Sequence, residues 1–496
     1  MLYKFGLEAF NGSIVALATN RYDYEAFLNK TPSRTFARVG LLTGLNQAFQ
    51  CVGSILIAPL VKHFRTKNVL LSAVMIFGLF TAVLLIVDAA TGGSFAPPAY
   101  RKKHPKNDFS YYGDYANDGI IPIYTFAGVA YGMVELIRRV IPRDIVGGDV
   151  RKLRLMDAFV HILYEVAGTS GAFCTALGLI PRFGNNYSFL ITPICFAFAA
   201  VAWFFIREEK RAAQIEGALG DQPPFLKAVL VGFWLFIESV WTGGKILFTS
   251  RKFVWLVPGY AVALYMHRYL ENGLAPAIAR RYLGNSAWSQ IAVGGSNFGE
   301  LLGAVSVILF AGSIPTPMPF LRLDSLLLLI VWYLGYWYPP SGEMNQAWIM
   351  AATFIPISFG WAAGDVSLAA YIQSSLARVE SRTTNVSALG AVMAFLYSFY
   401  IVTYAICSPL LGKYIDSVSN KNNGDIHQAV RMVGGVHFTV ACVLVLCSTF
   451  VPKGALSLNP PLLSDGHLDE KPIVDGAVKE EARKEGAVEE AIASIK

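Results

Sequence analysis

Residues 153–173 of the chain have the sequence LRLMDAFVHILYEVAGTSGAF. The stretch is mostly apolar and as long as a membrane-spanning helix, yet it carries Asp157, His161 and Glu165. Because these residues are four apart, a helix places them on one face, with about 6 Å of rise between neighbours. Ionisable groups at membrane depth are costly and usually face a water-filled cavity, where they bind ions or relay protons. A partly solvated helix end is the simpler alternative, chiefly for Asp157.

The composition indicates that a membrane surrounds this helix. Of the 496 residues, 54% are hydrophobic and only 15% are charged, whereas soluble domains are about 25% charged. The mean hydropathy is +0.46, and aromatic residues make up 13% of the chain, as expected if Trp and Tyr gather at the membrane surfaces. The net charge of +7 lies in loops between apolar segments, without a nucleic-acid-binding motif. We therefore expect a lipid bilayer as a partner and no nucleic acid.

Known catalytic signatures are missing from the sequence. No GxxxxGK[ST] motif occurs, which argues against an ATP-driven pump, and neither GxSxG nor HExxH occurs, which argues against a hydrolase. Six cysteines lie in apolar runs without a CxxC pair or a His-linked zinc spacing, so we interpret them as small hydrophobic residues. We expect neither an enzyme nor a cofactor.

The apolar runs predict an all-α membrane protein with twelve transmembrane helices in two pseudo-symmetric six-helix bundles. The chain shows no cleavable signal peptide, and an N-terminal segment missing before residue 1 is left open. The first bundle would occupy 1–206 and the second 252–452. The expected spans are 2–20, 37–61, 68–90, 119–140, 153–177, 186–206, 252–271, 286–311, 319–338, 345–375, 384–411 and 431–451.

Two segments fall outside the twelve spans. Residues 207–251 form a polar break followed by the run 225–248, whose clean apolar core is only about ten residues long. We interpret this run as an interfacial helix within a central cytoplasmic loop. Residues 453–496 are rich in Pro, Glu and Lys, which predicts a disordered tail. If the N-terminus is cytoplasmic, the inner loops hold more basic residues than the outer loops, which favours this orientation.

The two halves resemble each other in sequence. The segment 126–136, FAGVAYGMVEL, aligns with 359–368, FGWAAGDVSL, after a one-residue adjustment, and Tyr164 then falls against Tyr397. A second similarity pairs the sequence GLN at 44–46 with GSN at 295–297. Two similar segments in the same order on either side of a polar break indicate a parallel six-plus-six repeat.

With twelve spans, two halves and a central polar loop, the chain resembles the major facilitator superfamily (MFS) of secondary transporters over about residues 1–452. The superfamily's signature between spans two and three, roughly G-x-x-x-D-R-x-G-R-R, is only partly present: Lys62, Arg65 and Lys67 remain, but the Asp and both glycines are absent. The long loops are similar to those of fungal members. The resemblance implies transport of a small solute by alternating access.

The same resemblance implies that spans one, four, seven and ten line a central cavity, with two, five, eight and eleven beside them. Polar residues in those spans are then candidates for the substrate path: Glu8, Asn11, Asn46, Gln50, Glu135, Arg138, Tyr164, Asn297, Glu300, Asp365, Gln373 and Tyr397. Glu135 and Arg138 are three apart and can pair with each other, or mark a helix end. We interpret His267, Arg268 and Glu271 as interfacial residues near the end of span seven.

Two mechanisms fit Asp157, His161 and Glu165. A His between two carboxylates can titrate near neutrality, which suits proton coupling. Alternatively, the same side chains chelate a divalent metal, with Glu300 as a further donor from a facing helix. We favour proton coupling over a metal carrier, and expect no resident metal. A membrane receptor that uses a transporter fold is a third possibility.

The sequence also suggests an oligomeric state, a membrane and partners for the protein. We expect a monomer in the plasma membrane, with the vacuole or another organelle as the alternative, whose partners are a small-molecule substrate and protons. Asn186 begins the glycosylation sequon Asn-Tyr-Ser in an expected outer loop.

Overall fold

The structure is a computed structural model that describes residues 1–64, 66–95, 111–146, 150–205, 225–310, 312–376, 387–460 and 463. Some side chains within these ranges, including those of Arg138 and Asp157, are not described. Every regular element in the described ranges is helical, so the predicted all-α class is confirmed.

The first half of the chain, residues 1–205, contains five long helices and several short ones. They are α1 (Leu2–Leu28), α2 (Thr35–His63), α3 (Thr66–Ala90), η1 (Asn117–Gly119), α5 (Ile120–Val146), α6 (Val150–Cys174), η2 (Thr175–Leu179), α7 (Ile180–Tyr187), η3 (Ser188–Leu190) and α8 (Ile191–Phe204).

The second half, residues 257–460, follows the helix α10 (Phe225–Thr249). It contains η5 (Val257–Val262), α11 (Ala263–Tyr269), η6 (Leu270–Leu274), α12 (Ala275–Arg281), η7 (Ser286–Trp288), α13 (Ser289–Phe310), α14 (Met318–Leu327), η8 (Leu328–Val331), α15 (Trp332–Tyr336), α16 (Met344–Leu376), α17 (Ala388–Lys421), α18 (His427–Val430), η9 (Arg431–Val436) and α19 (His437–Ser448).

The described part of the chain contains nine helical stretches that are long and apolar enough to cross a bilayer, and the protein is an integral, multi-pass membrane protein. One stretch, Phe159–Phe204, runs over 46 residues and is bent at Gly184, where φ is +77°. Glycine adopts this left-handed backbone at little cost. The helices α1 and α5 and the helical run 257–281 are of comparable length but carry ionisable side chains.

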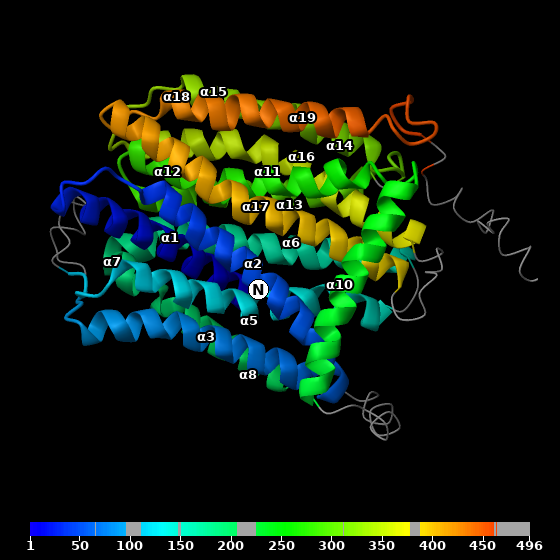
Figure 1. Cartoon of the computed structure of the whole chain (residues 1–496), viewed down its shortest axis with the longest axis horizontal. Coiled ribbons are helices and arrows are strands. Elements are labelled where there is room, and N and C mark those ends of the chain that lie inside the picture. The colour runs from blue at the N-terminus through cyan, green and yellow to red at the C-terminus, as the bar shows by residue number, and fades with distance from the viewer. Residues whose placement is uncertain are drawn as a thin grey trace, which may run out of the picture.

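Buried hydrophobic side chains form two large clusters that follow the two halves. One contains residues between Leu7 and Ala200. The other lies almost wholly between Leu247 and Leu463. Figure 1 shows the corresponding separation, with most first-half helices (blue to cyan) on one side and the second half (green to orange) on the other. Packing of apolar side chains therefore holds each half together internally.

The two halves meet mainly along two helix pairs, α2 with α17 and α6 with α13. Glycines allow the backbones to approach closely, as small residues do between membrane helices. A Cβ added at Gly40 of α2 would lie 2.6 Å from the carbonyl oxygen of Ser408 in α17. Likewise, a Cβ at Gly412 of α17 would lie 2.2 Å from the carbonyl oxygen of Phe36.

The helix α10 coincides with the run 225–248 that the sequence predicted as a helix, but its apolar part is longer than the expected ten residues. It spans 25 residues, and Val229–Thr249 is itself long and apolar enough to be one of the nine candidate spans. Gly243 packs closely against Ala391 of α17, while Leu230, Trp234 and Trp241 are 65–68% exposed. Figure 1 shows α10 crossing the other helices steeply, at the end of the molecule opposite α12 and α18.

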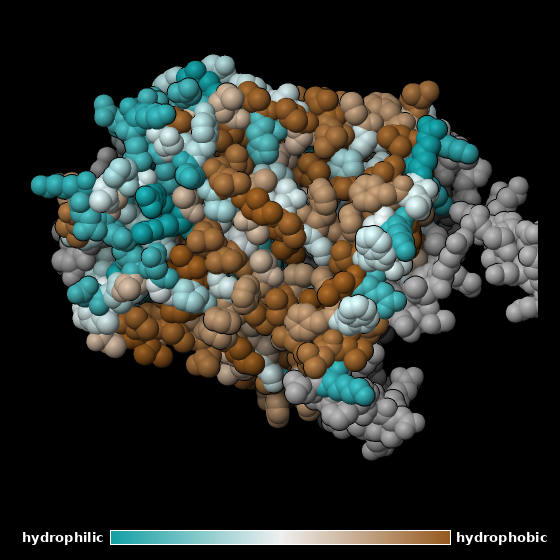
Figure 2. Space-filling model, viewed as in Figure 1, coloured by the Kyte–Doolittle hydropathy of each residue, from teal (hydrophilic) through white to brown (hydrophobic). Residues whose placement is uncertain are grey.

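The surface agrees with a membrane setting. Figure 2 shows apolar side chains covering the middle of the visible face, while polar ones gather at the end that carries α12 and α18. Exposed apolar residues of this kind on α3, for example Leu79 and Ile86 at 62% and 61%, suit contact with lipid.

Three expectations outside the cavity need correction or restriction. Asn186 is fully buried and its amide nitrogen donates to Asp88 at 2.8 Å, so the sequon is not accessible for glycosylation. Arg322 of α14 donates to the carbonyl oxygen of Ser457 at 2.8 Å, which fixes residues that the sequence assigned to a disordered tail. The break 206–224 and the tail residues 464–496 lie outside the described residues.

Candidate functional site

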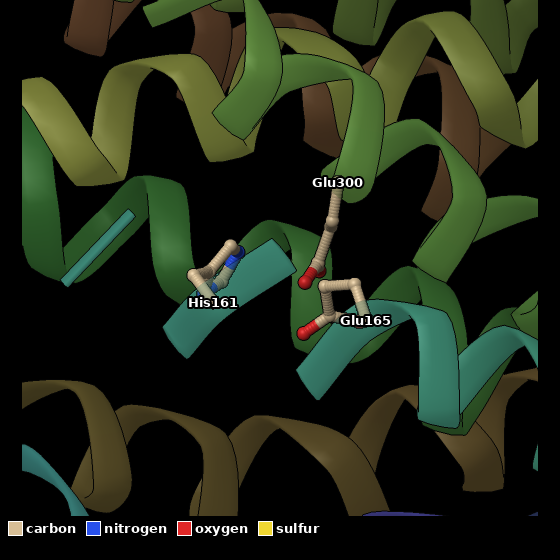
Figure 3. A group of neighbouring side chains, drawn as sticks. All are labelled: His161, Glu165 and Glu300. Atoms are coloured by element: carbon tan, nitrogen blue, oxygen red, sulfur yellow. The ribbon is translucent and has the colours of Figure 1, made fainter. Parts of the chain in front are cut away.

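His161 and Glu165 of α6 face Glu300 of α13, and Figure 3 shows the three side chains directed toward one another. One nitrogen or oxygen atom of each residue lies within 4.8 Å of those of the other two. Glu165 is 2% exposed and Glu300 is 7% exposed. The group, called the α6–α13 cluster below, therefore joins ionisable side chains from both halves in a buried position.

A lysine of the first half lies next to this cluster. Lys4 of α1 forms an ion pair with Glu8, one turn further along the same helix, and also interacts electrostatically with Glu165. The Lys4 ammonium lies 4.5 Å from the ring centre of Tyr164, a cation–π contact. The Tyr164 hydroxyl donates to Glu135 at 2.5 Å. Glu135 is therefore held by Tyr164, while its pairing with Arg138 stays a prediction, since the Arg138 side chain lies outside the described residues.

The second half supplies a matching ion pair. Arg268 of α11 donates to Glu271 at 3.0 Å and also interacts electrostatically with Glu300. The Ser296 hydroxyl donates to the other Glu271 oxygen and shares a 2.6 Å hydrogen bond with Ser358 of α16. The Arg268 side chain is 38% exposed. The network therefore includes one side chain that is only partly buried.

The prediction that His267, Arg268 and Glu271 are interfacial is wrong for the two residues that are buried. His267 is 3% exposed and Glu271 is 8% exposed, and His267 lies 3.0 Å from Asp324 of α14. The expected span ended at residue 271, but the helical run continues to Arg281. Its apolar pattern is interrupted by these polar residues, which made the middle of the helix look like its end.

Several predicted cavity residues form hydrogen bonds within the first half, and their role in the cavity stays a prediction. Asn11 of α1 accepts a hydrogen bond from the Tyr124 hydroxyl at 2.9 Å. Asn46 of α2 donates to the Tyr124 carbonyl oxygen at 2.7 Å, and Gln50 donates to Asn46 at 2.8 Å. These amides satisfy buried backbone and hydroxyl groups between α1, α2 and α5, so their observed contacts are structural.

The remaining predicted residues divide into three groups. Tyr397 of α17 accepts a hydrogen bond from the Tyr260 hydroxyl at 3.0 Å. Asp365 and Gln373 are half-buried on α16, and their role in the cavity stays a prediction. The side chains of Asp157 and Arg138 lie outside the described residues.

The sequence analysis missed Lys4, Ser296 and Ser358. Lys4 lies near the start of the chain, where a lysine is usually a helix-end residue. A signal was nevertheless present: Lys4 and Glu8 are four apart in span one, and Arg268 and Glu271 are three apart in span seven. In each of these spans a basic residue is followed by an acidic one at a spacing that places both on one face of a helix.

The two halves are also joined at the end of the molecule that carries α12. Asp23 of α1 accepts hydrogen bonds from Arg280 at 2.6 Å and from Arg281 at 2.9 Å. In the opposite direction, Asp416 of α17 accepts from the backbone N–H groups of Phe36 and Ala37, at 3.1 and 2.8 Å. We call these contacts the end latch.

A cavity of about 300 Å³ adjoins the latch. Its lining includes residues of both halves: Asp23, Tyr24, Ala26, Phe27, Thr31, Ser33, Arg280, Arg281 and Asn420.

The arrangement of the helices resembles that of solved membrane transporters. The nucleoside transporter NupG matches with a TM-score of 0.52, over 90% of this chain and 98% of that chain, at 10% sequence identity. The D-xylose–proton symporter matches with a TM-score of 0.51, over 91% and 97%, at 12% identity. A POT-family transporter in complex with 5-aminolevulinic acid matches with a TM-score of 0.56, over 91% and 95%, at 12% identity. Neither a protein-family model nor a curated protein sequence matches the chain.

The chain shares the fold of these solved membrane transporters. Because the identities are only 10–12%, the likeness shows the fold and not the substrate. This likeness supports the resemblance inferred from the sequence for the all-α transporter fold, while the twelve spans, the two six-helix bundles and the fungal origin stay predictions.

Proposed function

We propose that this protein is a secondary transporter that moves a small organic solute across a membrane by alternating access and couples the movement to protons. The observation that carries the proposal is the α6–α13 cluster. His161 and Glu165 come from one half and Glu300 from the other, and one nitrogen or oxygen atom of each lies within 4.8 Å of those of the other two. The likeness to solved transporters supports a carrier rather than an enzyme.

The proposal includes twelve spans in two six-helix bundles. The nine candidate spans count Phe159–Phe204 once, and the bend at Gly184 divides it into two. Adding α1, α5 and the run 257–281 and treating α10 as interfacial gives twelve. The two apolar clusters support the division into residues 1–206 and 252–452. On this view the cytoplasmic segment 207–251 carries α10 along the membrane surface.

Proton coupling follows from the position of the cluster between the halves. Carboxylates this close repel each other when both are charged, and a proton on one of them or on His161 relieves that repulsion. Rocking of one half against the other would change the separation of Glu165 and Glu300. The cluster would therefore bind a proton more tightly in one facing state than in the other, which is the condition for coupling.

The end latch defines which state the structure represents. Contacts of Asp23 and Asp416 hold the halves together at the end that carries α12, while α10 lies at the opposite end. With the N-terminus cytoplasmic, the latched end is the outer one. The structure then corresponds to a transporter closed to the outside.

Counterflow in proteoliposomes made with the purified chain tests the carrier proposal. A transporter accelerates exchange of a labelled solute against the same solute inside, and a receptor with this fold does not. We expect Glu165→Gln and His161→Ala to abolish the pH dependence of exchange while the protein stays folded. Unchanged pH dependence in both variants would refute the coupling role, and no exchange of any solute in a broad metabolite panel would refute transport.

A divalent-metal carrier is the second candidate, because the cluster also brings together one imidazole and two carboxylates. Such donors suit first-row transition metals, whose bound waters would complete the coordination. A rise in melting temperature with Mn²⁺ or Zn²⁺ that is lost in Glu300→Gln, together with metal uptake into vesicles, would favour this candidate. A monomeric state and the plasma membrane remain predictions from the sequence.

A further inference from the structure

We propose that the solute is a small amine that also carries an oxygen acceptor, and that Asn297 and Glu300 of α13 bind it. The inference rests on the proposed function, since it takes the surroundings of the α6–α13 cluster as the transport site. It adds the chemical class of the solute.

Asn297 and Glu300 form a donor and an acceptor side by side. They are three residues apart on α13 and therefore share a face of the helix. Asn297 is 4% exposed and Glu300 is 7% exposed. Within the described part of the chain, the Asn297 amide nitrogen has no hydrogen-bond partner. Because buried polar groups are nearly always hydrogen-bonded, this arrangement calls for a partner that binds there.

Both groups lie between α6 and α13. A Cβ added at Gly168 of α6 would lie 2.7 Å from Lys4 Cε and 2.9 Å from the Asn297 amide nitrogen, so that amide faces α6 beside the cluster. The Glu300 carboxylate points toward His161 and Glu165 (Figure 3). Because Gly168 has no side chain, Lys4 and Asn297 approach the α6 backbone closely at this point, and the solute would have to displace the Lys4 side chain to reach the Asn297 amide.

The charges around Glu300 select for a cation. Glu165 and Glu271 are like-charged neighbours, while Arg268 and Lys4 are the opposite charges that act on Glu300. Both cations already form ion pairs with other carboxylates, Arg268 with Glu271 and Lys4 with Glu8. An anionic solute would meet repulsion from the carboxylates of Glu165 and Glu271, which also act on Glu300, and a neutral one would not offset that negative charge. An ammonium group supplies both a donor and a charge.

Lys4 shows which groups near the site contact an ammonium group. Lys4 is 7% exposed, and its ammonium is held by the Glu8 carboxylate and the face of the Tyr164 ring. Carboxylate and ring are the groups that recognise alkylammonium ions. Asn297 adds a requirement: its N–H donor needs an acceptor on the same molecule, which an alcohol or carbonyl oxygen provides.

Four matched compounds test the class of solute. They are 3-aminopropan-1-ol, propylamine, propane-1,3-diol and 3-hydroxypropanoate, which differ by one group at each end of a three-carbon chain. With the purified full-length chain at constant pH, we expect melting temperature to rise most with 3-aminopropan-1-ol, less with propylamine, and not with the diol or the anion. Equal effects of the amines and the diol, a larger effect of the anion, or no effect of any compound would overturn the proposal.

Two variants assign the contacts. Glu300→Gln should weaken binding of 3-aminopropan-1-ol by about tenfold or more, because a charge-assisted hydrogen bond is lost. Asn297→Leu should keep the preference for amines but remove the advantage of 3-aminopropan-1-ol over propylamine. The exposed Glu343→Gln serves as the matched control and should behave as the unaltered protein. Retention of full amine binding by Glu300→Gln, with its melting temperature in the absence of ligand unchanged, would contradict the assignment.

Failure of this inference is distinguishable from failure of the proposed function. If vesicles exchange a neutral or anionic solute and no amine, transport stands and the amine class is wrong. If the amines bind with the expected preference but no solute crosses the membrane, the binding site stands and transport is wrong.

Discussion

Tyr164 holds two ionisable residues at once through different parts of its side chain. Its hydroxyl donates to Glu135 at 2.5 Å, and its ring lies under the Lys4 ammonium, 4.5 Å from ring centre to nitrogen. The two contacts link α5, α6 and α1 next to the proposed proton site. Tyr164 was a candidate on the sequence because it aligned with Tyr397, but its partners come from positions far apart in the chain.

The two contacts of Tyr164 can be separated by substitution. Tyr164→Phe removes the hydrogen bond to Glu135 and keeps the ring, so we expect destabilisation of about 1 kcal/mol. Tyr164→Leu also removes the cation–π contact, which adds about 0.5–2 kcal/mol. Thermal unfolding of the two purified variants in the same detergent measures the difference. Equal melting temperatures for Tyr164→Phe and Tyr164→Leu would mean that the ring does not stabilise Lys4.

At the residue scale, the sequence predicted part of the site. The four-residue spacing of His161 and Glu165 places them on one face of α6, and Glu300 was named as the donor from a facing helix. The sequence underestimates the burial of charged side chains near an expected helix end, such as Lys4 and Glu271. Local spacing gives the face of a helix, but which helix lies opposite depends on packing between segments more than 100 residues apart.

At the scale of elements, α10 is the helix whose placement relative to the membrane stays a prediction. Its length allows it to span a bilayer, but Figure 1 shows it inclined steeply to the helices that it crosses. It contacts α17 of the second half and α2 of the first. An interfacial α10 would therefore lie across both halves at the end opposite the latch.

Depth measurements distinguish an interfacial α10 from a spanning one. Spin labels at Leu230→Cys, Trp234→Cys, Trp241→Cys and Phe248→Cys, in a cysteine-free background, should all report a shallow and similar depth. A spanning helix would place the first and last labels about 27 Å apart along the membrane normal, from a rise of about 1.5 Å per residue. A steady change of depth along the four positions would contradict the interfacial placement.

Helix boundaries were predicted well where the apolar pattern ended in turn residues and poorly where buried charges interrupted it. The expected span 68–90 nearly coincides with α3, Thr66–Ala90. Span one was expected at 2–20, but α1 continues to Leu28 because Arg21 and Asp23 are buried by partners from elsewhere. A hydropathy pattern reflects the free-energy cost of burying a charged side chain, but it does not reveal a partner distant in the sequence that offsets this cost.

At the scale of the whole molecule, the end latch and the α6–α13 cluster lie on the same boundary between halves. Asp23 belongs to the first half and its partners, Arg280 and Arg281, to the second. Asp416 makes the reverse connection, from the second half to the start of α2. Opening the latched end must break both sets of contacts, so their strength biases the equilibrium between facing states.

Weakening the latch should open that end of the molecule. The backbone N–H and carbonyl oxygen of Ser33 hydrogen-bond with the Asn420 side chain across the boundary, at 3.0 and 2.9 Å, so a short bifunctional thiol reagent should cross-link a Ser33→Cys and Asn420→Cys pair. We expect Asp23→Asn to slow this cross-linking several-fold because it removes the charge shared by two arginines. Asp118→Asn, at an exposed position of the same half, is the control. An unchanged rate in Asp23→Asn would show that the latch does not hold the halves together.

Solute-driven proton movement tests the central claim most directly. Vesicles containing the purified chain and a pH-sensitive dye are exposed to an exchanged solute, and the internal pH is followed for the unaltered protein, Glu165→Gln and the control Glu343→Gln. The account predicts that the solute moves protons in the unaltered and control proteins, while Glu165→Gln still binds solute but moves no protons with it. Proton movement at the unaltered rate in Glu165→Gln would contradict the account.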